Sequence, residues 1–364
     1  MKIRFIDAGA VSGLRSQTIY HGLAYAQKPD TPDTIVLATP ETPYMCIGYF
    51  QDAENELNIK YCKSNHLPVI RRETGGGAVY IDSGQLFVQW IFQQDSLPKR
   101  VDQRFQLFVK PLIETYRFFE INAYYHPIND VHVGGKKIVG TGAGTIGEAQ
   151  VVTGNFLFDF DYSTMINAIN VPGNEFRDEA RKNLQLYLTT MKLELEKLPE
   201  RGEVINVYRK KCEEILGLNT ELGEFTDREL REMELLDKKF GEDDWIFQTK
   251  RKAPENKLFK IHLGVWIGQV TEKVDGGKLR ALITIKDNCI DAIKLAAEGF
   301  ETTGYSLLEL ENGLTGMLMD RELILRKVKS IVGEHHYKEW VDCIYKVKEL
   351  QLQQTGHGAL ARSN

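Results

Sequence analysis

Three consecutive glycines stand between two short runs of β-forming residues in the segment RRETGGGAVYID, residues 71–82. The runs at 67–71 and 78–82 are rich in branched and aromatic side chains, which predicts two strands joined by a loop. Glycines have no Cβ, so the backbone can come close to a ligand and successive amides can converge on an anion. The segment therefore predicts either an anion-binding loop or a flexible hairpin tip.

Two arginines, Arg71 and Arg72, come directly before this loop. A guanidinium can grip a carboxylate or a phosphate through two parallel hydrogen bonds. Two cations beside a glycine-rich loop are therefore typical of a site for an anionic group. Two solvated arginines on a hairpin are the alternative when this segment is taken alone.

A second cluster of polar residues lies at 129–140. Asn129 and Asp130 open a short β-like run, and the pair of glycines after that run suits a tight hairpin turn. Lys137 lies at the start of the returning strand, so a rigid element should hold its ammonium as a point charge for a phosphate or carboxylate. The alternative is that Lys136 and Lys137 only keep the hairpin soluble.

The remaining sequence mixes β-like runs with amphipathic segments, which predicts an α+β fold. Pro111 should kink or restart the helix in which it lies. The expected strands are at 34–39, 44–49, 67–71, 78–82, 86–92 and 151–160, and the expected helices are at 18–27, 105–119, 178–197 and 203–216.

A length of 364 residues suits two domains. Residues 249–257 are polar, basic and contain a proline, so they are expected to be a linker. Residues 1–248 then form the larger domain and residues 258–350 a small α+β domain, which begins with a β-meander and ends in helices. Residues 351–364 are expected to be a flexible tail.

Composition argues against several classes of protein. Apolar residues make up 42% of the chain, as in soluble globular proteins, and a net charge of −5 argues against nucleic acid as the main partner. Five scattered cysteines without CxxC spacing indicate reduced thiols rather than a disulfide frame or a zinc site. With no signal-peptide core and no run of 18 apolar residues, we expect a cytoplasmic protein that does not span a membrane.

Residues 142–147, GAGTIG, match the dinucleotide-binding pattern G-x-G-x-x-G, with Asp159 and Asp161 following at a suitable spacing. That pattern requires a helix that begins at the third glycine. The chain continues instead into the β-like run 151–160, which leaves no room for such a helix. A nicotinamide or flavin site is therefore disfavoured.

Together the two polar clusters resemble those of lipoate–protein ligases and their relatives, the octanoyl- and lipoyltransferases and the biotin ligases. Arg72, the three glycines, Ala78, Val79 and Asp82 are similar to the family signature R-x-[ST]-GGG-x-V-x-H-D. Residues 129–140 are similar to its N-D…K-x-x-G segment. Weaker similarity extends over residues 1–320.

The resemblance implies a catalytic domain at 1–248 with the biotin–lipoate ligase fold, a mixed β-sheet flanked by helices as in class II synthetases. Residues 258–350 would be the α+β accessory domain. In that family the lysine contacts both the acyl and the phosphate groups of an acyl-adenylate, which assigns the catalytic role to Lys137. The acyl- and adenylate-binding residues so implied are Arg72, Gly75, Gly76, Gly77, Ala78, Tyr80, Asn129, Asp130 and Gly140, without a metal-binding side chain.

Three positions depart from the family pattern. Ile81 stands in place of the histidine of the signature, and Thr153 stands where many relatives carry a second histidine. Gly142 stands where many relatives carry alanine. These departures bear on the details of adenylate contact rather than on Lys137 and Arg72.

The activity implied by the resemblance is activation of lipoate or octanoate by ATP, with Mg²⁺, to an acyl-AMP, and transfer of the acyl group to a lysine of a carrier protein. The implied carriers are lipoyl domains of 2-oxoacid dehydrogenase E2 subunits or the glycine-cleavage H protein. An ATP-independent lipoyl- or octanoyltransferase, a biotin ligase and a non-catalytic partner protein are the alternatives. Some transferases of this family use a cysteine beyond the K-x-x-G segment, and none lies between Cys62 and Cys212, so a ligase is favoured.

Overall fold

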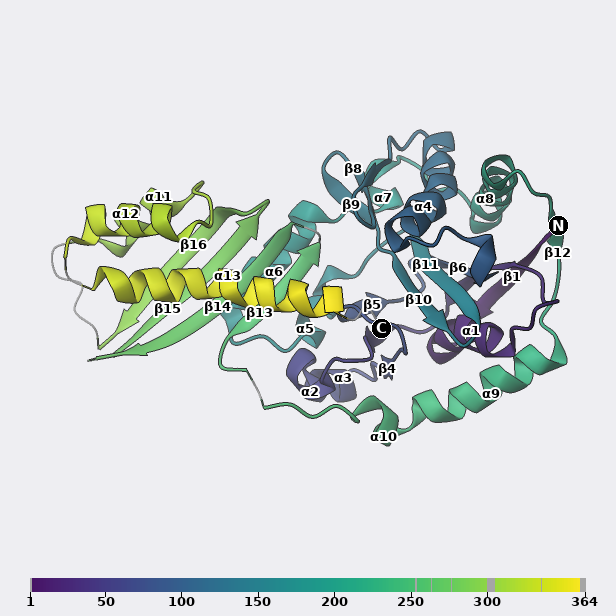
Figure 1. Cartoon of the computed structure of the whole chain (residues 1–364), viewed down its shortest axis with the longest axis horizontal. Coiled ribbons are helices and arrows are strands. Elements are labelled where there is room, and N and C mark those ends of the chain that lie inside the picture. The colour runs from purple at the N-terminus through teal and green to yellow at the C-terminus, as the bar shows by residue number, and fades with distance from the viewer. Residues whose placement is uncertain are drawn as a thin grey trace. The chain divides into compact units, whose positions relative to one another are not determined.

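The computed structural model describes residues 2–252, 254–262, 264–275, 277–299, 305–334 and 336–360, with side chains as far as residue 354. The chain forms two compact units (Figure 1). The first unit is Met1–Asn170 with Gln185–Arg251, and the second is Val171–Leu184 with Lys252–Asn364.

The first unit contains three β-sheets and most of the helices. Its strands are β1 Ile3–Val11, β2 Thr34–Pro40, β3 Tyr44–Ile47, β4 Val69–Arg71, β5 Val79–Ile81, β6 Gln85–Gln93, β7 Tyr124–His126, β8 Asp130–Val133, β9 Lys136–Val139, β10 Gly142–Ile146, β11 Ala149–Leu157 and β12 Thr220–Leu222. Its helices are α1 Gly13–Ala26, α2 Ala53–Glu56, α3 Ile59–Ser64, the 3-10 turn η1 Gln94–Ser96, α4 Val101–Phe118, α5 Tyr162–Ala168, α7 Met191–Glu194, α8 Arg201–Leu216, α9 Asp227–Gly241 and α10 Asp243–Ile246.

The main sheet of this unit is mixed, with the strand order β10-β11-β6-β2-β1-β12. The pairs from β10 to β2 are antiparallel, and the last two pairs are parallel. Strand β2 explains why helices must cover both faces: Ile35 and Leu37 belong to one apolar cluster, and Val36 and Ala38 belong to another. Alternate residues of a strand point to opposite faces, so both faces of β2 are core.

The two faces carry different helices. The cluster of Ile35 and Leu37 includes side chains of α4 and α8, among them Phe108 and Tyr208. The cluster of Val36 includes α1 and Met233 of α9. The main sheet is therefore a layer between helices, and the predicted α+β fold with a mixed sheet is confirmed.

The two smaller sheets carry the sequence clusters described above. Strands β4, β3 and β5 form one sheet, in the order given, and β7, β8 and β9 form the other. Gly134 and Gly135 join β8 to β9 with φ angles of +55° and +80°. Both values lie in the left-handed region, where glycine has no steric penalty, so the predicted primed turn is confirmed.

Some sequence predictions differ from the structure in this unit. Helix α4 runs without interruption from Val101 through Pro111 to Phe118, so the predicted restart at the proline is wrong. Burial of Phe108 and Leu112 on the same face outweighs the lost helical hydrogen bond. Helix α1 starts earlier than predicted, because the Ser12 side chain accepts a hydrogen bond from the Arg15 amide and caps it.

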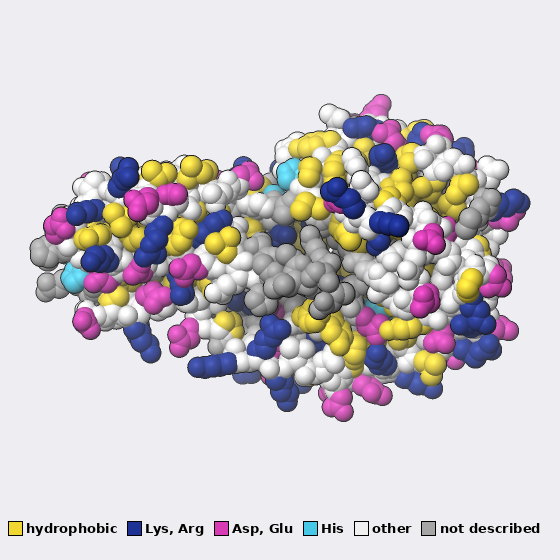
Figure 2. All heavy atoms as spheres, in the orientation of Figure 1, with side chains coloured by type: hydrophobic (Ala, Val, Ile, Leu, Met, Phe, Trp, Pro, Cys, Tyr) yellow, Lys and Arg dark blue, Asp and Glu magenta, His cyan; other side chains and the backbone are white. Residues whose placement is uncertain are grey.

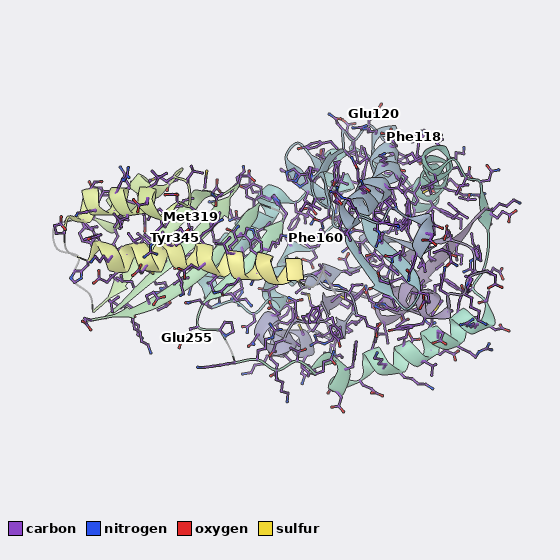
Figure 3. The ribbon with its side chains drawn as sticks, in the orientation of Figure 1. Phe118, Glu120, Phe160, Glu255, Met319 and Tyr345 are labelled. Atoms are coloured by element: carbon purple, nitrogen blue, oxygen red, sulfur yellow. The ribbon has the colours of Figure 1, made fainter. Side chains whose placement is uncertain are left out.

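The second unit is a four-stranded antiparallel sheet with helices. Its strands are β13 Lys257–His262, β14 Val265–Val274, β15 Gly277–Lys286 and β16 Cys289–Glu298, and its helices are α11 Leu307–Leu314, α12 Arg321–Val332 and α13 Tyr337–Leu360. Its core lies between the sheet and these helices; Met319 belongs to it and Tyr345 packs against it (Figure 3).

Two segments of the second unit are grouped differently from the sequence analysis. Helix α6, Asn174–Tyr187, was expected in the larger domain, but Val171–Leu184 belongs to this unit. Glu179 accepts a hydrogen bond from Thr284, and Glu175 pairs with Lys294. Residues 351–360 were expected in a flexible tail, yet they continue α13 because the buried stripe of Val347 extends to Gln351; residues 361–364 lie outside the described part of the chain.

Acidic and basic side chains are interspersed over the face shown in Figure 2. This distribution fits a net charge of −5 that arises from many ionised groups of both signs. Among the helices that the structure describes, none is both long enough and apolar enough to cross a membrane.

The contact between α1 and α9 predicts a sharp difference between two glycines. A Cβ on Gly22 would lie 2.6 Å from Cγ of Met233, whereas a Cβ on Gly202 of α8 would meet nothing within 4 Å. Gly22→Ala should lower the free energy of unfolding by about 1–3 kcal/mol through overpacking. Gly202→Ala should change it by less than about 1 kcal/mol. Urea denaturation measures both, and equal effects would contradict the close packing of α1 and α9.

Candidate active site

The glycine-rich loop leaves β4 after Arg71 and returns at the start of β5. It lies directly on the chain that follows β3. The amide of Tyr49 donates to the carbonyl of Thr74 at 3.0 Å, and a Cβ on Gly48 would lie 2.3 Å from the carbonyl oxygen of Gly76. The loop is therefore seated on a glycine that no larger residue could replace without moving it.

Arg72 holds this loop from within. Its guanidinium donates to the carbonyls of Gly75 and Gly77, each at 2.8 Å, and to the carbonyl of Cys46 at 3.3 Å. Several N–H groups of Arg72, which was predicted to bind an anionic ligand, therefore donate to the backbone of the loop. Its contact with an adenylate stays a prediction.

The tip of the loop is open. Gly75, Gly76 and Gly77 are exposed, and a Cβ on Gly75 or Gly77 would meet nothing within 4 Å. Gly76 has a φ of +98°, which is strained for any residue with a side chain. The loop therefore offers accessible backbone at a fixed place, which is what close approach of a nucleotide requires.

Arg71, by contrast, is fully buried and has a structural role. Its guanidinium makes six hydrogen bonds of 2.6–3.2 Å to the carbonyls of residues 48, 49, 51, 245 and 246. The indole Nε1 of Trp245 donates back to the carbonyl of Arg71 at 2.9 Å. The hypothesis that Arg71 grips a ligand is therefore wrong, because carbonyls of its own chain occupy the guanidinium.

Lys137 lies on β9 with its ammonium 2.8 Å from Oδ1 of Asp130. The Asp130 carboxylate is buried, and about a fifth of the Lys137 side chain (20%) is exposed. A Cβ on Gly140 would lie 3.6 Å from the Lys137 ammonium, so the glycine leaves space beside it. The structure therefore brings Lys137, Asp130 and Gly140 together, with the ammonium paired to the buried carboxylate and part of the lysine side chain exposed.

The hairpin of Lys137 is joined to the glycine-rich loop through β10. Asn129 and Thr141 interlock at the base of the hairpin. The side-chain amide of Asn129 donates to the backbone carbonyl of Thr141, and the Thr141 hydroxyl donates to the backbone carbonyl of Asn129. Beyond Thr141, a Cβ on Gly144 would lie 3.4 Å from Cγ2 of Thr74. The two sequence clusters thus meet across a few residues of β10. Strand β10 continues into β11 without a helix, and this excludes the dinucleotide-binding alternative, which requires a helix after the third glycine.

Two further predicted residues lie in or beside β5. Ala78 is half-buried at the end of the loop. Tyr80 is a core residue, with an edge-to-face contact to Phe160 at 5.7 Å between ring centroids. Burial and the neighbouring Asp82 raise the pKa of Tyr80, so its hydroxyl stays protonated. A direct contact of Tyr80 with the acyl group or adenylate remains a prediction.

The departures from the family pattern also have clear positions. Ile81 is buried beside Tyr44, Cys46 and Ile70, so it fills the core where the signature has a histidine. Thr153 lies opposite Gly142 in the β10–β11 pair, and a Cβ on Gly142 would lie 3.3 Å from its hydroxyl.

One supporting residue has no signal in the sequence. His21 of α1 is fully buried; its Nδ1 lies 2.8 Å from the carbonyl of Gln17, and its Nε2 accepts from the amide of Glu73 at 3.2 Å. Both contacts are satisfied by the neutral ring with the proton on Nδ1. Burial lowers the pKa of His21 to about 4, so the neutral form persists near neutral pH.

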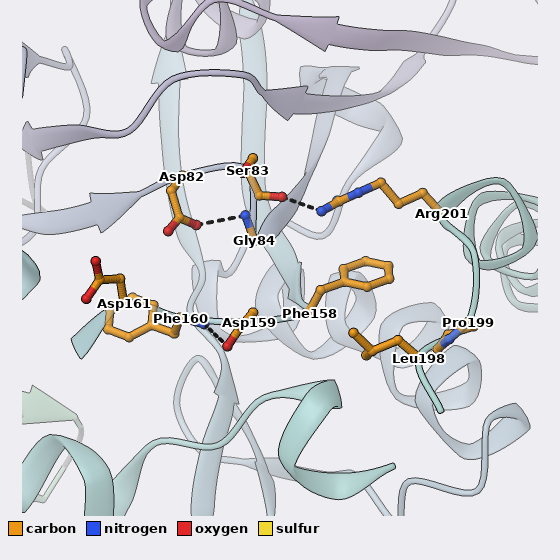
Figure 4. Close-up of a pocket in the computed structure, with 10 residues that line it drawn as sticks. All are labelled: Asp82, Ser83, Gly84, Phe158, Asp159, Phe160, Asp161, Leu198, Pro199 and Arg201. Carbon is orange, nitrogen blue, oxygen red and sulfur yellow. Dashed lines mark hydrogen bonds between the residues drawn. The ribbon is translucent and has the colours of Figure 1, made fainter. Parts of the chain in front are cut away.

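A surface hollow of about 440 Å³ lies at the ends of β5 and β11, and its lining includes Asp82 of the signature but none of the residues predicted to bind the acyl group or adenylate (Figure 4). Asp82, Asp159 and Asp161 line it together with Arg201. Asp82 accepts from the amide of Gly84 and Asp161 caps α5, so these carboxylates are engaged locally. An anionic nucleotide would be repelled by this lining, and we do not assign the hollow to the reaction.

The hydrogen bonds of the Arg71 guanidinium predict that replacing this side chain greatly lowers the stability of the fold. Arg71→Leu leaves five carbonyls without their charged donor, those of Gly48 and Ile246 in buried positions, so the free energy of unfolding should fall by about 3–5 kcal/mol. Arg100→Leu removes an arginine that is exposed and paired with Asp102. It is the matched control and should behave like the unaltered protein in urea denaturation. A small effect of Arg71→Leu would contradict a structural role.

His21 predicts a pH dependence of stability. The pKa of His21 is about 4 in the folded chain and 6.5 when unperturbed, so between these values the unfolded chain binds more protons. The stability contributed by neutral His21 is present above pH 6.5 and is lost as the pH falls towards 4. Between pH 7 and 5 the loss should be about 1–2 kcal/mol. His21→Gln should flatten this part of the curve, and an unchanged slope would contradict the assignment.

The sequence of this chain is similar to those of known proteins. The family described as "Lipoyl protein ligase A/B catalytic domain" matches residues 20–213. Lipoate–protein ligase 2 of Staphylococcus aureus is 25% identical over 304 residues, 79% of this chain and 83% of that protein. Octanoyltransferase LipM of Anoxybacillus flavithermus is 23% identical over 275 residues, 67% of this chain and 98% of that protein.

Solved structures agree on the fold. The bipartite lipoate protein ligase of Thermoplasma acidophilum, studied with its E2 lipoyl domain, aligns with a TM-score of 0.63 at 24% identity, over 69% of this chain and 98% of that chain. A lipoate–protein ligase A bound with ATP aligns with a TM-score of 0.58 at 22% identity, over 68% of this chain and 99% of that one. The family match covers more than half of the sequence, and this chain therefore belongs to the lipoyl protein ligase A/B family.

Proposed function

We propose that this protein activates lipoate or octanoate with ATP and transfers the acyl group to a lysine of a lipoyl carrier domain. The observation that carries the proposal is the Lys137–Asp130 pair beside Gly140, on the hairpin whose continuation contacts the glycine-rich loop. An accessible cation beside accessible backbone suits a substrate that carries both a carboxylate and phosphates. Relatives named as lipoate–protein ligases support the same reaction.

The first step joins the acid to the nucleotide. A carboxylate oxygen attacks the α-phosphorus of ATP, the bond from that phosphorus to the bridging oxygen of the β-phosphate breaks, and pyrophosphate leaves. Negative charge builds up on the α-phosphate in the transition state. We assign its stabilisation to the Lys137 ammonium and to amides of the loop at 75–77, which are fixed before the reaction begins.

Asp130 positions the catalytic lysine. Its buried carboxylate holds the Lys137 ammonium at 2.8 Å, and the Asn129–Thr141 interlock fixes the backbone on either side of the hairpin. A long lysine side chain otherwise samples many rotamers, and ordering it in advance removes that cost from the transition state.

The second step transfers the acyl group. The neutral amine of the carrier lysine attacks the carbonyl carbon of the acyl-AMP, the bond from that carbon to the phosphate oxygen breaks, and AMP leaves while the amine loses a proton. Lys137 would contact the same carbonyl and phosphate oxygens in this step. The proposed carriers are E2 lipoyl domains or the glycine-cleavage H protein, and the Thermoplasma relative was studied with an E2 lipoyl domain.

The residues present fit ATP. The glycines at 75 and 77 leave open space where any other residue would place a Cβ, so phosphates could approach the backbone there. Mg²⁺ would supply further neutralisation of the phosphates. Asp130 is engaged with Lys137, so we expect the ion to bind mainly through the nucleotide, as is usual for Mg²⁺ at phosphate sites.

The two units would have different roles. We propose that residues 1–248, apart from the segment 171–184 that belongs to the second unit, form the catalytic domain, because Lys137 and the loop both lie in the first unit. Residues 258–350 would form the accessory domain, with 249–257 as the linker. The similarity to Plasmodium falciparum LipL1, with a TM-score of 0.55 over 94% of this chain, extends to both regions and supports this division only at the level of fold.

An ATP-independent transferase is the second candidate, because one relative is an octanoyltransferase. A thioester route needs an accessible thiolate. Cys46 lies 3.5 Å from the Arg72 guanidinium but is fully buried, and burial raises the pKa of its thiol. Burial also raises the pKa of Cys62 to about 11. These cysteines are poor nucleophiles at neutral pH, which favours the ligase.

The proposal is tested by mass spectrometry of a purified lipoyl domain. The protein is incubated with that domain, ATP, Mg²⁺ and a panel of short acids. A lipoyl or octanoyl adduct that requires ATP is the expected result. An adduct formed without ATP, from an octanoyl-loaded carrier, would replace the ligase by a transferase. No adduct by either route, together with no shift of the melting temperature by ATP, would favour a non-catalytic partner protein.

Two neighbouring lysines provide a matched test of the site. Lys137→Met should lower the rate of lipoate-dependent pyrophosphate release by about 100-fold or more, because it removes a charge that acts in the transition state. Lys136→Met alters the preceding residue of the same strand, which points to the other face, and should retain activity. Equal losses in both variants would contradict the assignment of Lys137.

A further inference from the structure

The four residues before the three glycines alternate in what they contact. Arg72 and Thr74 contact the loop and β10, as described above. Arg71 and Glu73 contact the segment 227–246, which comprises α9 and α10. Arg71 also binds the carbonyls of residues 48, 49 and 51, and Glu73 also contacts α1. Strand β4 ends at Arg71 and the backbone bends at residues 73 and 74, so two of the four residues contact the loop and β10 while the other two contact helices.

Glu73 makes three of the contacts with the helices. Its carboxylate, 12% exposed, lies 2.7 Å from the ammonium of Lys239 and accepts from the hydroxyl of Tyr25 at 2.6 Å. Its amide donates to Nε2 of His21. Three residues from two helices therefore fix both the backbone and the side chain of a residue one position from Thr74.

Lys239 is itself held in place by aromatic rings. Its ammonium lies 4.1 Å from the ring centroid of Trp245, a cation–π contact, and Trp245 stacks on Phe240 with centroids 5.4 Å apart. Phe240 in turn meets the ring of His21 edge-on at 4.9 Å. The Lys239 side chain is 44% exposed, and its ammonium lies between the Glu73 carboxylate and the indole face, two contacts that together limit where it can lie.

Helix α9 is anchored to α1 along its length. Asp237 pairs with Arg15 and accepts from the hydroxyl of Thr18 at 2.6 Å. Met233 packs on Gly22. The packing of α9 on α1 therefore holds the C-terminal end of α9 beside the glycine-rich loop.

The partners in α9 and α10 lie beyond residue 213, where the match to the family's catalytic region ends. We propose that α9 and α10 form a clamp that positions the glycine-rich loop for adenylate formation, with Glu73 and Lys239 as positioning residues. The proposal rests on the function proposed above. Three successive glycines lose more conformational freedom on ordering than other residues, so an external clamp lowers the cost of holding the loop ready for the substrate.

The test compares three variants of the full-length protein. Lys239→Met keeps the aliphatic stem but removes the charge, Lys239→Arg can pair with Glu73 and stack on Trp245, and Lys238→Met changes an exposed neighbour on the same helix. The measurements are kcat and KM for lipoate-dependent pyrophosphate release, with hydrogen exchange of the amides at 73–78 and the melting temperature.

Lys239→Met should lower kcat/KM by about tenfold and speed exchange of the loop amides, with a nearly unchanged melting temperature. Lys239→Arg should restore most of the activity, and Lys238→Met should match the unaltered protein. Unchanged kcat/KM and exchange in Lys239→Met would overturn the clamp, as would a loss accompanied by general unfolding that arginine does not rescue. If the unaltered protein releases no pyrophosphate, the proposed function fails, and exchange of the loop amides still decides whether the clamp exists.

Discussion

A single buried guanidinium determines where the glycine-rich loop can lie. Arg71 gathers carbonyls from residues 48–51 and from residues 245 and 246, so three distant parts of the first unit meet at the foot of the loop. Buried carbonyls need donors, and a charged donor shared among several of them is costly to lose. The loop, the strand end at Gly48 and helix α10 are consequently parts of one structure rather than three independent surfaces.

The proposed reaction depends on a second fixed charge. The Lys137 side chain is partly exposed and its ammonium is held by a buried carboxylate, an arrangement in which the cation is ordered before a substrate arrives. Arg72 has become part of the loop, since its N–H groups bind the carbonyls of Gly75 and Gly77. Of the two cations predicted to face the substrate, the one free to do so in this structure is therefore Lys137, and Arg72 acts first on the shape of the loop.

Local patterns in the sequence predicted local features well. The β-branched run at 34–39 is strand β2, and the glycine pair at 134–135 forms the expected turn. Features that depend on distant partners were not predictable in this way. Nothing near Arg71 in the sequence indicates that two of its acceptors are 174 and 175 residues away, and a lone histidine at position 21 gives no sign that it accepts from the amide of Glu73. The sequence shows which residues can bind an anion, and the fold shows which of them are already engaged.

Activation of the acid as its adenylate is the central step of the proposed reaction. Lipoate or octanoate labelled with ¹⁸O at both carboxylate oxygens tests this step most directly. Attack on the α-phosphorus makes one carboxylate oxygen the bridge of the acyl-AMP, and transfer to the carrier lysine leaves that oxygen on AMP. Mass spectrometry should therefore find AMP that carries ¹⁸O, in an amount equal to the acylated carrier. Acylated carrier without labelled AMP would contradict activation through an adenylate.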